Sequence, residues 1–142
     1  MLGHKKLLGL AERSLPGLRK HLGIGRIDID LLPGEVPVVE VSFPDSERQS
    51  IYITDAGAQL LCIAYLWRDA DVISKQRAAL METLLDLNPS VPLSSFGRID
   101  DHFVLVGALS PAASVDDLAL ELATLSDNAR DALITLADFL KT

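Results

Sequence analysis

Three consecutive residues, Asp100, Asp101 and His102, come closest in this sequence to an acid–base cluster. Histidine changes its charge near neutral pH, and neighbouring carboxylates favour its charged form. However, paired aspartates are also common in tight turns, and no second histidine lies nearby in the sequence. We therefore favour a hairpin turn here. A small enzyme that uses His102 with Asp100 remains the alternative.

Two further carboxylates, Asp28 and Asp30, alternate with apolar residues and are expected on one face of a strand. Together they could share a divalent cation through oxygen ligands, but such a site usually needs more converging ligands. We interpret them as solvated carboxylates, so no metal site is assigned.

The single cysteine, Cys62, lies among apolar residues in mid-strand, where burial disfavours the reactive thiolate. We expect it to be buried and inert. Residues 23–25 read Gly-Ile-Gly, but they lack the third glycine and the following helix of a dinucleotide site. No catalytic residue and no cofactor is assigned.

Composition limits the class of protein. The chain has 142 residues, of which 49% are hydrophobic and 23% charged, as in an ordinary globular domain, and we expect one domain over residues 1–142. Its net charge of −7 disfavours nucleic-acid binding, which needs clustered basic residues. The apolar run near the start is ended by polar residues and no cleavage site follows, which disfavours a signal peptide. A single cysteine suits a reducing compartment. We expect a cytoplasmic protein.

Charge is distributed unevenly along the chain. Residues 1–26 carry a net charge of +5 and the remainder −12. Leucines recur at helical spacing within residues 1–22, with Pro16-Gly17 between them, which predicts a basic helix kinked near residues 14–17. We expect this helix to dock on an acidic helix of the same fold. A membrane-surface adaptor that uses residues 1–22 is the alternative.

Hydrophobic periodicity predicts the remaining elements. Strands are expected over residues 27–31, 36–43, 50–54, 59–67, 93–98 and 102–109, and helices over residues 72–87 and from Ser114 to the end. Ser114 and Asp117 have the spacing of a capping box. The order α-ββββ-α-ββ-α, with short turns between consecutive strands, predicts an α+β fold with a mainly antiparallel sheet and helices packed on it.

The strand over residues 59–67 is apolar on both faces. Helices on one face would leave the second row uncovered, and soluble monomers rarely expose so large an apolar patch. We therefore expect a partner or dimer surface at Leu61, Ile63, Tyr65 and Trp67. A symmetric homodimer is the first expectation, with an unknown protein client as the further occupant.

This order of elements resembles the type III secretion chaperone-like fold, whose members are small acidic proteins that bind client segments, usually as dimers. More narrowly, the chain resembles the YjfI-like bacterial family of unassigned activity. The resemblance rests on residues 51–54, the apolar strand over residues 60–67, Asn88-Pro89, and the strand over residues 103–109 that leads into residues 114–117. It implies a non-enzymatic protein-binding module, and it suggests a bacterial membrane-stress pathway.

Overall fold

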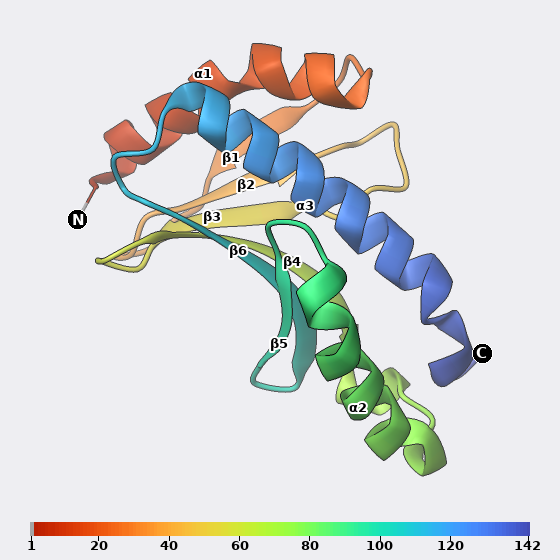
Figure 1. The fold of residues 1–142 in the computed structure, drawn as a ribbon. Coiled ribbons are helices and arrows are strands. Elements are labelled where there is room, and N and C mark those ends of the chain that lie inside the picture. The colour runs from red at the N-terminus through yellow and green to blue at the C-terminus, as the bar shows by residue number, and fades with distance from the viewer. Residues whose placement is uncertain (1) are drawn as a thin grey trace.

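The computed structural model describes residues 2–142 and contains a six-stranded sheet with three α-helices (Figure 1). The helices are α1 (His4–Leu22), α2 (Arg77–Leu87) and α3 (Val115–Thr135). The strands are β1 (Asp28–Leu31), β2 (Val38–Ser42), β3 (Ile51–Asp55), β4 (Leu60–Arg68), β5 (Ser95–Ile99) and β6 (His102–Leu109). This order confirms the α+β fold expected from the sequence.

The sheet has the strand order β1-β2-β3-β4-β6-β5, and every neighbouring pair is antiparallel. The first four strands form a meander because short turns join them. The β5–β6 hairpin then extends the sheet, because β6 pairs with the edge of β4 opposite β3. Its tight turn contains Asp100 in a left-handed conformation with φ 53°, which aspartate tolerates better than most residues.

Helices α1 and α3 lie against each other on one face of the sheet (Figure 1). A close approach between them occurs at Gly17, where a Cβ would stand 3.0 Å from the Ala119 Cβ. Helix α2 contributes Leu80 and Leu84 to the same apolar core near β5 and β6. The core is therefore a single layer between one face of the sheet and the helices. Its largest fully buried side chains are Phe103, Leu7, Leu18, Ile51, Ile53, Leu60, Leu80, Leu105, Leu118, Leu122, Leu125 and Val39.

The helix predicted over residues 72–87 begins later than expected, at Arg77. Residues 72 and 73 are held by the C-terminal segment instead. Val72 forms a bridge with Leu140, and the Ile73 amide donates to the Phe139 carbonyl at 2.9 Å. These long-range backbone contacts compete with helix formation and leave only short 3₁₀ turns before α2.

Helix α1 runs from His4 to Leu22 with Pro16 in its interior, and α3 includes the polar residues 126–128. The predicted cap of α3 is present: the Ser114 hydroxyl accepts from the Asp117 amide at 3.0 Å, and Asp117 accepts from the Ser114 amide. The polar residues within α3 anchor other segments. Arg48 binds Ser126 and Asp127 at 2.9 and 2.7 Å, and Asn128 donates to the Pro92 carbonyl at 2.8 Å.

Candidate functional site

We call the face of the sheet opposite the helices the open face, because no helix of residues 2–142 covers it (Figure 1). Residues that pair directly on neighbouring strands share a face. A row of such paired residues across the sheet therefore shows which side chains the open face carries. This row runs Asp30, Glu40, Tyr52, Ile63 and Val106. The open face is thus acidic on β1 and β2, aromatic at its centre, and aliphatic on β4 and β6.

The partner surface expected on β4 lies on this face for three of its four residues. Leu61 and Tyr65 are half-buried, and Ile63 is buried. They alternate with Cys62 and Ala64, whose side chains belong to the core.

Trp67 is on the opposite side of the sheet, which corrects its expected place in this row. A β-bulge shifts the pairing between Tyr65 and Trp67, so that Trp67 pairs with Phe103. The two rings lie 5.8 Å apart in the core, and Trp67 is only 5% exposed. The extra residue in the bulge reverses the alternation on which the sequence-based expectation rested.

An aromatic ladder crosses the centre of the open face. Tyr52 and Tyr65 meet edge to face with ring centroids 5.6 Å apart, and Tyr65 meets His102 in the same way at 5.2 Å. Beside the ladder is a shallow hollow of about 510 Å³, lined by Gln49, Ser50, Tyr52, Tyr65, Ile99, Asp100 and His102. The Tyr52 hydroxyl donates to Glu40 at 3.2 Å. Burial raises the pKa of Tyr52, and the charge of Glu40 raises it further.

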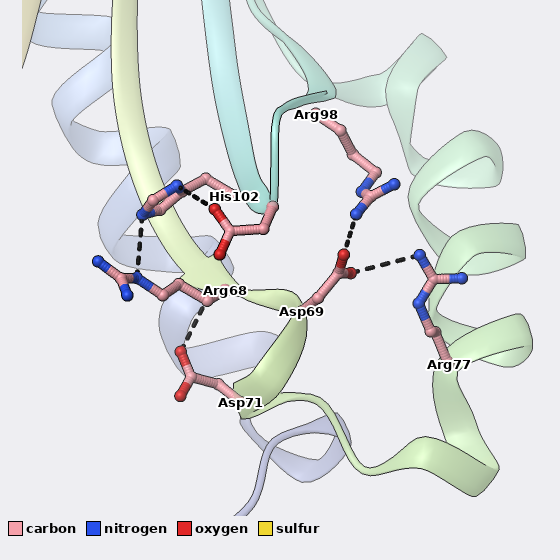
Figure 2. Close-up of polar contacts among 7 residues, drawn as sticks. Arg68, Asp69, Asp71, Arg77, Arg98 and His102 are labelled. Atoms are coloured by element: carbon pink, nitrogen blue, oxygen red, sulfur yellow. Dashed lines mark hydrogen bonds and ion pairs between the residues drawn. The ribbon is translucent and has the colours of Figure 1, made fainter.

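His102 has both ring nitrogens engaged (Figure 2). Nδ1 lies 3.1 Å from the Asp101 carboxylate, and Nε2 lies 3.2 Å from Nε of Arg68. An arginine Nε–H can only donate, so Nε2 is the acceptor and Nδ1 carries the proton. The lone pair that a general base would need is therefore occupied. The predicted hairpin turn is present, and this arrangement does not favour acid–base chemistry at His102.

Asp69 connects three elements beside this network (Figure 2). Its carboxylate accepts hydrogen bonds from Arg98 on β5 and from Arg77, the first residue of α2. The bond from Arg77 Nη2 is 3.3 Å long. The Arg98 guanidinium also lies over the Phe103 ring, 5.1 Å from its centroid. Since one carboxylate binds an arginine from β5 and another from α2, we interpret this cluster as a structural anchor for α2.

The other candidates from the sequence are not brought together. Asp28 faces Arg26 at 3.7 Å, and among residues 2–142 no group of three or more potential metal-ligating side chains is assembled. Cys62 is fully buried, as expected, and burial raises the pKa of its thiol well above the ordinary value, with the charge of Glu121 adding to this effect.

Sequence reasoning missed two features. Glu40 and Tyr52 were each assigned to a strand, but nothing in the sequence showed that they would meet. Glu121 was hidden within an acidic helix. It is 3% exposed beneath Gly107, its Oε1 has no hydrogen-bond partner within the described residues, and burial raises its pKa to about 7. Its position on the apolar side of α3 was the available signal, since Leu118, Leu122 and Leu125 lie on that side.

Comparison with known families matches residues 16–140 to the family described as "Uncharacterized protein conserved in bacteria (DUF2170)". The chain belongs to this family. The match covers most of the sequence and confirms the expected bacterial family of unassigned activity. No curated protein matches the sequence.

Solved structures share the fold at low sequence identity. A chain of the heterodimeric ExoU–SpcU complex from the type III secretion system of Pseudomonas aeruginosa is 18% identical, with a TM-score of 0.53, covering 89% of this chain and 96% of that one. A chain of the HopA1–SchA chaperone–effector complex is 15% identical, with a TM-score of 0.54, covering 92% of this chain and 97% of that one. YbjN, described as a putative transcription regulator from E. coli, is 16% identical, with a TM-score of 0.54, covering 91% of this chain and 94% of that one. These likenesses confirm the predicted chaperone-like fold.

Proposed function

We propose that this chain is a non-enzymatic protein-binding module that holds a segment of a client protein on its open face. The observation that carries the proposal is the second face of β4, over which no helix of residues 2–142 lies and where the half-buried Leu61 and Tyr65 flank the buried Ile63. Two of the structures that share the fold are complexes between proteins, one of them described as chaperone–effector. The occupied lone pair of His102 supports a binding role over a catalytic one.

We further propose that the module acts in the bacterial cytoplasm, in a membrane-stress pathway, and as a homodimer. Alongside α2 runs a small apolar groove of about 120 Å³, lined among others by Met81, Leu84, Leu85 and Phe96. Leu85 is 71% exposed there. An apolar surface of this kind suits a second copy of the chain, and two-fold homodimers are the commonest soluble oligomers. The open face would then stay accessible to a client.

No helix of residues 2–142 is long and apolar enough to cross a bilayer. The apolar side of α1, which includes Leu7, Leu10 and Leu18, is buried in the core. A membrane-surface adaptor would need that side for lipid, so the protein-binding proposal is favoured over the membrane alternative.

Site-specific photo-crosslinking in bacterial cells tests this proposal. A benzoyl-phenylalanine at Leu61 on the open face is compared with one at Leu120, which is 46% exposed on α3. We expect crosslinked adducts heavier than a homodimer from position 61, and fewer of them when Tyr65 is also changed to Glu. Position 120 should give no such adducts. Equal adducts from both positions, or adducts insensitive to Tyr65→Glu, would contradict a client site on the open face.

A further inference from the structure

The chemistry of the hollow on the open face identifies one kind of side chain that it can hold. The faces of tyrosine rings carry negative electrostatic potential and attract cations within about 6 Å of the ring centre. Tyr52 and Tyr65 meet edge to face at the hollow, so their rings present differently oriented surfaces to it. The volume of about 510 Å³ exceeds that of any single side chain.

Carboxylates stand on two sides of these rings. Glu40 accepts from the Tyr52 hydroxyl, and Asp100 lines the hollow directly. Asp30 pairs with Glu40 across the strands and extends the acidic side toward the edge of the sheet. The raised pKa of Tyr52, due to burial and then to the charge of Glu40, fits a negative local potential.

Basic side chains do not cancel this potential inside the hollow. Of the described residues that line it, none is lysine or arginine. Arg68 does not line the hollow, although its Nε donates to the lining residue His102. A second copy of the chain stacked on this face would bring acidic β1 and β2 residues against a face without matching lysines, whereas a basic segment would neutralise them.

We propose that the hollow binds the cationic side chain of an arginine or lysine in the client segment, held over Tyr52 and Tyr65 and paired with Glu40 and Asp100. The inference rests on the proposed function and specifies its partner: an extended basic segment whose apolar residues lie along Leu61 and Ile63. The site would select clients by charge, while the apolar row supplies contact area.

Nuclear magnetic resonance titration of the full chain tests the cation site without any client. The probe is N-acetyl-arginine amide, compared with N-acetyl-glutamine amide, which keeps the amide groups but has no charge. We expect arginine to shift the ring signals of Tyr52, Tyr65 and His102, and glutamine to leave them in place. Equal shifts with both probes, or shifts with neither, would overturn the inference.

Matched variants locate the binding. Tyr65→Leu keeps an apolar side chain but removes the aromatic face, and Glu40→Gln removes one charge. Each should weaken arginine binding about two- to fivefold. Glu82→Gln, on the exposed side of α2, removes the same charge elsewhere and should leave the affinity unchanged. Circular dichroism confirms folding, and equal weakening by Glu82→Gln would show a mere net-charge effect.

Three labelled twelve-residue peptides, four repeats of Thr-Val-X with X as Arg, Gln or Glu, separate this inference from the proposed function. Fluorescence anisotropy should show the Arg peptide binding tightest and weakening with salt. If the Arg and Gln peptides bind equally and both lose affinity on Tyr65→Glu, the client face stands and the cation site is wrong. If no peptide binds although the arginine probe shifts the rings, the cation site stands and segment binding is wrong.

Discussion

At the scale of single residues, the most unusual group is Glu121 on α3. Its carboxyl is buried against β6, where Gly107 leaves room for it. The Glu121 Oε1 has no hydrogen-bond partner among residues 2–142, and such burial favours the neutral form, because an ionised carboxyl would lose hydration without full compensation. Glu121 therefore makes the contact between α3 and the sheet sensitive to pH.

Burial raises the pKa of Glu121 to about 7, from an ordinary value of 4.5. The unfolded chain thus releases this proton at a lower pH than the folded chain does. The free energy of unfolding therefore keeps the full contribution of the protonated Glu121 below pH 4.5. It falls as the pH rises toward 7, by a total on the order of 3 kcal/mol. Glu121→Gln cannot ionise, so its free energy of unfolding should exceed that of the wild type increasingly over this range. Urea denaturation of both proteins from pH 4.5 to 8 measures the difference, and a constant difference would contradict the assignment.

Gly107 is the matching half of this contact. A Cβ at Gly107 would overlap the Glu121 Oε1 and stand 2.8 Å from its Cδ. We expect Gly107→Ala to destabilise the fold by about 1–3 kcal/mol, because the buried carboxyl must find another position. In a Glu121→Ala background the obstacle is gone, so the same change should cost much less. A double-mutant cycle by thermal denaturation checks this, and additive costs would show that the two residues do not interact.

At the scale of elements, most of the fold follows from patterns of apolar residues. The six strands, the β5–β6 turn and the cap of α3 were predictable because alternation, paired aspartates and the Ser114–Asp117 spacing are local signals. The start of α2 was not, since residues 72 and 73 are held by a C-terminal segment more than 60 positions away. The candidate site was predictable only in part for the same reason. The sequence indicated the row on β4, but neither the bulge nor the meeting of Tyr52 with Glu40 has a local signature.

The bulge in β4 divides the predicted surface row and gives a direct test. Tyr65 lies on the open face, whereas Trp67 packs against Phe103 in the core. Tyr65→Glu should therefore change the free energy of unfolding by less than about 1 kcal/mol, as is usual for surface substitutions. Trp67→Glu should cost about 4 kcal/mol or more, or prevent folding, since it removes a large core side chain and buries a charge. Circular dichroism during urea denaturation compares them, and equal effects would place both residues on one face.

At the scale of the whole molecule, the charges and the apolar surfaces are separated. The basic helix α1 lies against α3, whose segment from residue 114 to the end carries a net charge of −4. This arrangement matches the intramolecular docking that the sequence favoured. On the open face, Asp28 of β1 is paired with Arg26, whereas Asp30 of β1 and Glu40 of β2 form no ion pair among residues 2–142. The groove between α2 and β5 exposes Leu85. The two surfaces differ in chemistry, which supports different occupants for them.

The α2 groove gives the prediction for the assembly. If a second copy covers Leu85, light scattering at micromolar concentration should give the mass of a dimer, about twice 15.4 kDa. Leu85→Glu would place a charge in each half of that interface, and like charges brought together there would shift the protein toward monomer. Because Leu85 is 71% exposed in the single chain, this change should leave the circular dichroism spectrum intact. Ile134→Glu is the matched control, since Ile134 is 72% exposed on α3 and does not line the groove. A monomeric wild type would refute the dimer, and dissociation by Ile134→Glu but not Leu85→Glu would move the interface from the groove to α3.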